Sequence, residues 1–487
     1  MAASDDTDGP RDDASAASSG GHEALVAENA ALRSQIVGLL ARVAELEHRL
    51  GLNSSNSGKP PSSDGLKKPP RVSNQRGPTD KKTGGQAGHP GKTLCQVPEP
   101  DLTIDHFPPS CATCGRPLTG IAGDDYLARQ VFDLPVPLPL VVTEHRAHRC
   151  RCVGCGTATR ASFPEVVSAP VQYGARIAAF VVYLANYQFV PEDRLAALMA
   201  DLFGVSLSCA TIGQMSRRAA ERLHDFAEAV REEIVGAPVK HLDETGFRIG
   251  GRTKWLHIAA TLWLTFYRVS PKRGEMLAGV SGIIVHDHWK SYYLMQGVEH
   301  ALCNAHHLRE LQALVEIEHE DWARRMQVLL RRACHAANWA RDEKAALSPR
   351  LIDLITRRYD AIVADGTAFH EAQPALAIKL NHDGRPRGGR PPRRIGHNLL
   401  LRLGDRKHDV LRFLTNPAVP FTNNQAERDA RMMKLRQKIS GGFRSDQGAS
   451  DFAVIRTMIG TAKKKGWDII QSLIRDPQDL VAELSSA

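Results

Sequence analysis

The sequence predicts a multidomain α+β protein, and three observations support this prediction. The chain has 487 residues, 42% of them hydrophobic, which at ~150 residues per domain is enough for about three domains. Strand-like segments rich in β-branched and aromatic residues gather within residues 237–287, whereas helical periodicity dominates on either side. Paired cysteines and an N-terminal heptad repeat indicate smaller modules ahead of an α/β core.

Charge is unevenly distributed along the chain. The formal net charge is +9, but residues 1–58 hold four Arg against nine acidic residues, whereas residues 59–92 hold eight Lys and Arg against two. The basic block fits either a polyanion partner, most simply nucleic acid, or a solvated linker. The polar N-terminus has no apolar segment typical of a secretory signal, and no stretch is apolar enough to span a membrane. We therefore expect a cytoplasmic, nucleoid-associated protein with no membrane partner.

The N-terminal region predicts a dimerising coiled coil. Residues 1–22 are rich in Ala, Ser and Asp and are expected to be disordered. Over residues 23–51 a heptad follows, with leucines at d and a second series at a that includes one polar residue: Leu25, Leu32, Leu39 and Leu46; Asn29, Ile36, Val43 and Leu50. A parallel homodimer is the favoured interpretation. The alternative is an amphipathic helix packed on its own domain. Residues 52–95 are expected to form a basic Pro/Ser/Gly-rich linker.

Two CxxCG motifs predict a zinc ribbon over residues 96–165. Tight turns at Cys111, Cys114, Cys152 and Cys155 would direct four thiolates at one structural Zn²⁺. The intervening Val131–Val142 is expected to form a strand. The alternative is four unliganded thiols at this spacing.

Residues 166–235 have helical periodicity and resemble a helix-turn-helix. Pro191–Phe203 and Ser208–Leu223 would be the two helices, joined by a turn at Gly204. Arg217 and Arg218 would lie on the exposed part of the second helix and contact DNA. An ordinary helical hairpin would show the same pattern.

Acidic residues recur at strand ends and at one helix start in the remaining sequence. Val239–Phe247 reads as a strand containing Asp243 and Glu244, two more strands are expected over Lys254–Val269, and Ile283–Val285 leads into Asp287. Much later, Thr422 or Asn423 could cap a helix carrying Glu427. Three such carboxylates could hold two Mg²⁺ ions for phosphodiester chemistry. Spacing alone does not choose between Asp243 and Glu244, nor does it exclude ordinary surface acids.

Over nearly its whole length the chain resembles bacterial transposases of the insertion sequence 66 family. The resemblance rests on the paired CxxCG motifs and on five ordered segments: Leu52–Gly65, His241–Gly246, Asp287–Tyr292, Cys303–Leu311 and Phe421–Arg428. It implies a ribonuclease-H-like core with a DDE triad of Asp243, Asp287 and Glu427 that binds Mg²⁺ or Mn²⁺. The implied activity is cleavage of double-stranded DNA at transposon ends and strand transfer into target DNA. Accessory proteins encoded by the same element are possible further partners.

The resemblance also implies domain boundaries for the rest of the chain. The core would comprise residues 236–300, with a helix over 272–280, and residues 416–487, interrupted by a helical insertion over 301–415. Cys303 and His306 form a CxxH pair, read as a packed Cys and a hydrogen-bonded His in preference to a second zinc site. Basic residues on the Glu helix would bind DNA phosphates: Arg428, Arg431, Lys434, Arg436 and Lys438. The alternatives are a DNA-binding protein with an inactive core, and a nuclease or resolvase of the same fold.

Overall fold

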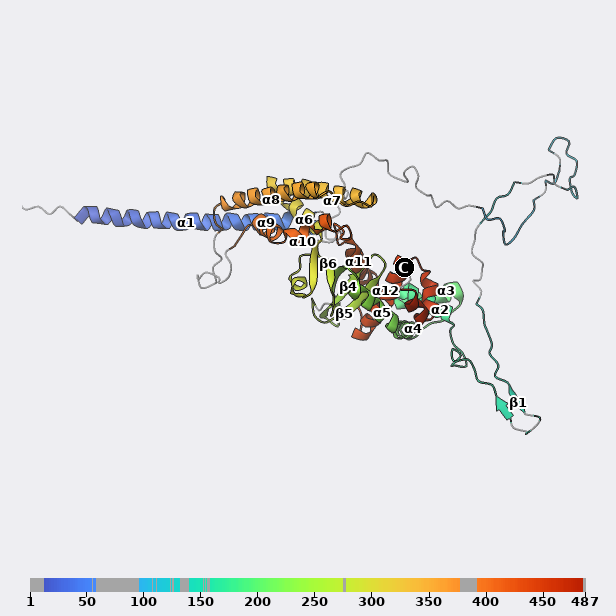
Figure 1. Ribbon diagram of the computed structural model, residues 1–487. Coiled ribbons are helices and arrows are strands. Elements are labelled where there is room, and N and C mark those ends of the chain that lie inside the picture. Colours follow the sequence, from blue (N-terminus) through green and yellow to red (C-terminus); the bar gives the residue numbers. More distant parts are fainter. Residues whose placement is uncertain are drawn as a thin grey trace, which may run out of the picture. The chain divides into compact units, whose positions relative to one another are not determined.

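A computed structural model describes most of the chain (Figure 1). The described residues are 13–54, 56–57, 96–106, 108–110, 112–122, 124, 127–131, 140–151, 153, 155, 158–274, 277–376 and 392–484. They fall into two compact units. The core unit takes its described residues from 1–77, 174–191 and 212–487, and the second unit from 78–173 and 192–211.

A mixed five-stranded sheet forms the centre of the core unit. Its order is β5-β4-β3-β6-β7, and its strands are β3 Val239–Ile249, β4 Arg252–Ala260, β5 Thr265–Ser270, β6 Gly282–His286 and β7 Val298–Leu302. β3, β4 and β5 are antiparallel neighbours, whereas β6 runs parallel to both β3 and β7. β3, β4, β5 and β6 lie where the sequence predicts strands, whereas β7 is a strand that the sequence analysis did not predict. The arrangement is consistent with a ribonuclease-H-like core.

The helix expected over residues 272–280 is wrong in the described part of that segment. Residues 271–274 and 277–280 form turns and bends. Gly274 and Gly279 both have φ of +75°, a left-handed conformation that ends a right-handed helix. The described residues between β5 and β6 therefore form turns and bends instead of a helix.

Helices cover both faces of the sheet. On one face, Leu242, Phe266 and Ile284 pack with helices α2 Ala175–Asn186, α5 His224–Gly236 and α12 Asp446–Lys465. α4 Cys209–Arg222 and two short C-terminal helices, α13 Ile469–Ile474 and α14 Pro477–Ala482, join this cluster. On the other face, Leu256 and Ile258 pack against α11 Asn424–Ile439 and α12. β3 therefore lies between two apolar layers.

The described residues between β7 and α11 form only helices and their connections. In order they are α6 Asn304–Ala313, a π-helical turn η3 Leu314–Glu318, α7 Asp321–Asp342, α8 Pro349–Glu371, α9 Ile395–Asp405 and α10 Lys407–Thr415. Their apolar faces form one cluster with Val285 of β6 and Leu302 of β7. The insertion thus shares its core with the sheet.

The N-terminal helix α1 extends over Asp13–Gly51, so it begins within the range 1–22 that the sequence suggests is disordered. The leucines at its d positions are exposed, from 42% at Leu46 to 66% at Leu39. At its C-terminal end His48 is buried, and its Nδ1 lies 3.1 Å from Oε1 of Glu318 in η3. The buried Asn56 donates its side-chain amide to Glu316 over 2.9 Å. Polar contacts therefore join this end of α1 to the insertion.

The second unit contains a short antiparallel hairpin, β1 Arg149–Arg151 and β2 Ala158–Arg160, and the helix α3 Glu192–Phe203. Residues 132–139 of the expected strand Val131–Val142 lie outside the described residues, and 131 and 140–142 are not in a strand. Across the described parts of both units, no helix combines the length and apolarity needed to span a membrane.

Candidate active site

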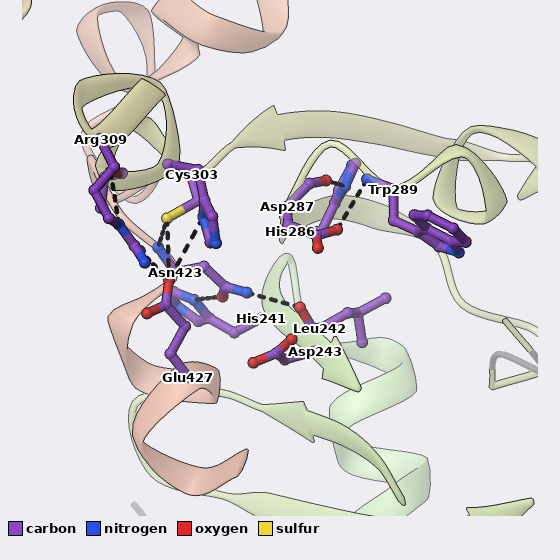
Figure 2. A network of polar contacts seen from close by, with 12 residues as sticks. His241, Leu242, Asp243, His286, Asp287, Trp289, Cys303, Arg309, Asn423 and Glu427 are labelled. Carbon is purple, nitrogen blue, oxygen red and sulfur yellow. Dashed lines mark hydrogen bonds and ion pairs between the residues drawn. The ribbon is translucent and has the colours of Figure 1, made fainter. Parts of the chain in front are cut away.

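Asp243 and Asp287 lie at the same level of two adjacent parallel strands. The register pairs His241 of β3 with Val285 of β6. Two residues further along each strand are Asp243 and, just beyond the end of β6, Asp287. The carboxyl ends of parallel strands are a usual place for active-site groups in α/β sheets. Figure 2 shows both carboxylates, with Glu427 of α11, extending from three different elements into one region.

The electrostatics of Asp243 show that this region holds excess negative charge. Burial and, to a smaller extent, the charges of Asp287 and Glu427 together raise the pKa of Asp243 to about 7, against a hydrogen bond from the Glu244 N–H to Oδ1 (2.8 Å) that lowers it. Asp287 accepts a hydrogen bond from the Trp289 N–H over 2.9 Å. A cation between the carboxylates would relieve the repulsion and favour the ionised form of Asp243.

Glu244 is committed to a separate network on the opposite face of β3. Its side chain is only 3% exposed and forms an ion pair with Arg273. Its Oε2 accepts a hydrogen bond from the Gly274 N–H over 3.0 Å and lies 3.5 Å from Nδ1 of His257. Of the two neighbouring acids, Asp243 is therefore the one directed toward Asp287 and Glu427.

Asn423 attaches the Glu helix to β3. It is 1% exposed and stands at the N-cap position of α11, but its side chain makes no capping hydrogen bond. Its Nδ2 donates to the carbonyl of Leu242 over 2.7 Å, and its Oδ1 lies 2.8 Å from Nδ1 of His241. The helix starts where the sequence predicts. Side-chain capping by Asn423 is wrong, because its amide nitrogen and oxygen contact Leu242 and His241 instead of the helix backbone. No local sequence pattern predicts the contacts of Asn423 with Leu242 and His241.

Glu427 is surrounded by hydrogen-bond donors from α6 and its own helix. Its Oε1 lies 3.6 Å from the Cys303 Sγ, 3.6 Å from Nδ1 of His306 and 3.5 Å from Nη2 of Arg309. On its other side, Arg431 lies 3.4 Å from Oε2. The CxxH pair therefore converges on the predicted catalytic Glu, and Arg309, one helical turn after His306, is a residue that the sequence reasoning missed.

The thiol of Cys303 is placed as a hydrogen-bonding group. It is buried, and it accepts a hydrogen bond from the Asn423 N–H over 3.1 Å. Burial and the negative charge of Glu427 raise the pKa of Cys303 to about 12, so the thiol stays protonated at neutral pH. Ligand atoms of Cys303, His306 and Glu427 do lie within 4.8 Å of one another, close enough for one metal ion. The packed-cysteine interpretation and a second zinc site therefore both stay predictions for this pair.

The basic residues proposed for DNA contact differ in their surroundings. Arg217 and Arg218 are exposed on α4, and on α11 four of the five are exposed: Arg428, Arg431, Lys434 and Lys438. Lys434 also donates to the carbonyl of Gly246 in β3 over 2.6 Å. Arg436 is half-buried, and its guanidinium lies 3.6 Å from the ring centroid of Phe443. Arg436 therefore contributes to packing.

The predicted zinc ligands are only half described. Cys114 and Cys155 are exposed in the second unit, whereas Cys111 and Cys152 lie outside the described residues. Cys150 lies on β1 opposite Thr159. The zinc site thus stays a prediction from spacing.

The chain belongs to the IS66 family of transposases. The model described as "Transposase IS66 family" matches residues 170–451, more than half of the chain, which confirms the resemblance seen in the sequence. Membership implies a transposase that binds DNA. A second model, described as "Family of unknown function (DUF6444)", matches residues 12–94. No curated protein matches the chain.

The donor set of the site fits a divalent metal. DDE transposases generally use such an ion, and Mg²⁺ prefers carboxylate oxygens and water as ligands. Asp243, Asp287 and Glu427 would supply oxygen ligands, and a bound cation would offset their mutual repulsion. Glu427 would exchange its contacts with Cys303 and Arg309 for the metal.

Proposed function

We propose that this protein cleaves DNA at transposon ends and joins the freed strands to target DNA, using Asp243, Asp287 and Glu427 as metal ligands. The observation that carries the proposal is the β3–β6 register, which brings Asp243 level with Asp287. The raised pKa of Asp243, caused by burial and by the other two carboxylates, supports it independently. Mg²⁺ or Mn²⁺ is the expected ion.

The proposed reaction has two steps at one site. In cleavage, a water oxygen forms a bond to the scissile phosphorus and the bond to the 3′ oxygen breaks, leaving a 3′-hydroxyl and a 5′-phosphate. In strand transfer, that 3′-hydroxyl attacks a target phosphodiester and displaces the target's 3′ oxygen. When bound, the divalent metal supplies Lewis-acid activation of the attacking oxygen and stabilisation of the leaving one. Within the chain, Asn423 holds α11 against β3, so that Glu427 stays beside the two Asp residues.

The remaining modules are assigned supporting roles. Exposed basic residues beside Glu427 would bind phosphates flanking the scissile bond, and Arg217 and Arg218 would contact the transposon end. A structural Zn²⁺ held by Cys111, Cys114, Cys152 and Cys155 would order the ribbon that recognises the end. The exposed heptad of α1 would pair two protomers so that both ends are held together. Accessory proteins encoded by the same element would be further partners.

The test is a plasmid transposition assay. A marker bounded by the DNA that flanks this coding region is supplied with the wild-type protein, with Asp287→Asn, or with the matched variant Glu244→Gln, together with any neighbouring genes. We expect insertions flanked by short target duplications from wild type, a loss of at least ~10³-fold in Asp287→Asn, and retention of activity by any folded Glu244→Gln protein.

The outcomes separate the alternatives. End cleavage without joined products would identify a nuclease or resolvase. Specific binding to the ends with no chemistry from any protein would identify an inactive, DNA-binding core. Wild-type activity in Asp287→Asn would refute the triad assignment.

A further inference from the structure

A cavity beside α11 lies outside the carboxylate cluster. It has a volume of about 570 Å³ and is lined by residues of α11, α12, β5 and the segment after α2. That volume is typical of pockets that bind small ligands or single groups of larger ones. Lining positions on α11 include Gln425, Arg428, Met432 and Leu435, which follow one stripe of the helix next to the stripe that carries Glu427 and Arg431.

Arg456 of α12 is the central group of this cavity. It is 7% exposed and lines the cavity, and its Nε and Nη1 have no hydrogen-bond partner among the described residues. Its guanidinium lies 5.0 Å from the ring centroid of Tyr187 and 5.8 Å from that of Phe189. An Arg side chain stays charged at any physiological pH. The Arg456 guanidinium also hydrogen-bonds the Tyr267 side chain, but leaving Nε and Nη1 buried and unused is unfavourable unless an acceptor enters from outside the fold.

The charges around Arg456 favour an anion as that acceptor. The lining contains four basic side chains, Arg428, Arg456, Lys463 and Lys464, against one acidic side chain, Asp429. Asp429 lies 3.3 Å from Nζ of Lys464, so this acid already has a basic partner. Lys463 is exposed, and its Nζ lies 5.9 Å from the Tyr187 ring centroid. Three basic side chains in the lining therefore have no acidic counterpart there.

Part of the cavity wall is aromatic and includes a residue with an unusual backbone conformation. Tyr187, Phe189 and Tyr267 line it, and Phe189 has φ of 60°, a left-handed conformation that is unfavourable for a bulky side chain. The surrounding packing holds Phe189 in place, since it is buried against Phe452 with ring centroids 6.3 Å apart. Aromatic rings beside unpaired guanidinium donors match a nucleotide unit, because bases and sugars pack on rings while phosphates accept from Arg.

We propose that this cavity binds a phosphate ester of a nucleic-acid strand, with Arg456 and Lys463 as phosphate ligands and Tyr187 against the adjoining nucleoside. The DNA part of this inference rests on the proposed function, whereas the phosphate part does not. Glu427 and Arg428 are neighbours on α11 but lie on adjacent stripes of the helix surface. A DNA strand bound in the cavity would therefore lie next to the carboxylate cluster and not within it. The cavity would then hold a nucleotide beyond the scissile phosphate, which is a recognition role separate from the chemistry.

The test compares Lys463→Gln and Arg456→Gln with the control Arg268→Gln in the full-length protein. Arg268 is exposed on β5 directly after Tyr267, on the opposite face of that strand, so its loss removes the same charge away from the cavity. Lys463→Gln changes an exposed side chain and leaves folding intact even if Arg456→Gln does not. Affinity for a transposon-end duplex is measured by fluorescence anisotropy at several salt concentrations, and stabilisation by inorganic phosphate and by a deoxynucleoside monophosphate is measured by thermal unfolding.

We expect Lys463→Gln and any folded Arg456→Gln to bind duplex roughly three- to tenfold more weakly than Arg268→Gln and to reduce the salt slope by about 1. They should also lose stabilisation by the monophosphate. Loss of stabilisation by phosphate or monophosphate with unchanged duplex affinity would assign the cavity to a free phosphate compound and overturn the DNA part. Unchanged results in both arms would overturn the whole proposal. Failure of wild type to bind the duplex at all would instead count against the proposed function.

Discussion

The side-chain amide of Asn423 donates to the backbone carbonyl of Leu242 over 2.7 Å. This single contact joins the N-terminus of the Glu helix to the residue immediately before Asp243, although 180 residues separate the two in the chain. The second contact of the amide, to His241, is just as short at 2.8 Å, and both are buried. The buried Asn423 amide therefore joins the start of the helix that carries Glu427 to the strand that carries Asp243.

Replacing Asn423 should damage the site by loosening this joint. Asn423→Ala leaves the Leu242 carbonyl and the His241 ring without their partner, which should lower the free energy of unfolding by about 2–3 kcal/mol. Urea unfolding followed by circular dichroism measures this loss, and the neighbouring Asn424→Ala is the control. An Asn423→Ala protein as stable as the control would show that the two hydrogen bonds contribute little.

The stability of the metal-free protein should depend on the charge of Asp243. The folded pKa is about 7 and the unfolded one ~3.9, so between these values the folded state binds more protons than the unfolded state. The free energy of unfolding therefore falls as pH rises from about 4 to 7, and Asp243→Asn removes this fall. At pH 8 the variant should be more stable than wild type by about 2 kcal/mol, a figure reduced for partial solvent screening.

Thermal unfolding of both proteins from pH 4.5 to 8.5 measures the difference. Adding Mg²⁺ provides the control, because a bound cation would offset the repulsion and stabilise wild type more than Asp243→Asn. Parallel pH profiles for the two proteins would contradict the assigned pKa.

The Cys303 thiol should be replaceable by a hydroxyl but not by a methyl group. Cys303→Ser keeps both a donor for Glu427 and an acceptor for the Asn423 N–H, whereas Cys303→Ala loses both and leaves a small cavity. We expect Cys303→Ala to be destabilised by about 1–3 kcal/mol and Cys303→Ser to retain most end cleavage. Zinc content should be equal in all three proteins; a loss of one equivalent in both variants would instead make Cys303 a metal ligand.

Zinc binding should depend on the cysteines of the two CxxCG motifs. Cys114→Ser or Cys155→Ser should remove one equivalent of Zn²⁺, measured by elemental analysis of the purified protein, because a structural site uses all four thiolates. Cys150→Ser, a change on β1 between the motifs, is the matched control and should keep the ion. Equal zinc content in all of these proteins would refute the ligand assignment.

Charge in the heptad of α1 should separate the protomers. Leu32→Lys combined with Leu39→Lys places two positive charges at d positions and should give a monomer by light scattering, since like charges in the seam oppose pairing. Ser34→Lys adds a charge outside the a and d positions and should stay dimeric. A monomeric wild-type protein would show that α1 does not pair.

The sheet and the Glu helix could be predicted from sequence because their signals are local. β-branched and aromatic runs mark β3 to β6, and the polar pair before Glu427 marks the start of α11. The choice between Asp243 and Glu244 could not be made from periodicity, since adjacent strand residues face opposite sides and both acids find partners. Only the network around Arg273 and Gly274, far along the chain, distinguishes them.

Contacts made by the insertion could not be predicted from sequence, because they join residues that are far apart in the chain. Arg309 contacts Glu427, which lies 118 positions later in the chain, and the side chain of Asn423 contacts β3 instead of its own helix. The expected helix over 272–280 is wrong because Gly274 and Gly279 adopt left-handed conformations. No sequence motif indicates Arg456. It is singled out only in the folded structure, where its Nε and Nη1 are buried without a hydrogen-bond partner among the described residues.

The two ends of the insertion meet, since the N–H of Asn304 donates to the carbonyl of Phe421 over 3.1 Å. An engineer could exchange the residues between them for a short connector without stretching the chain. The product would nevertheless expose Val285 and Leu302, which now pack under the insertion helices, and would aggregate. The insertion helices therefore cover apolar residues of the sheet that would otherwise face solvent.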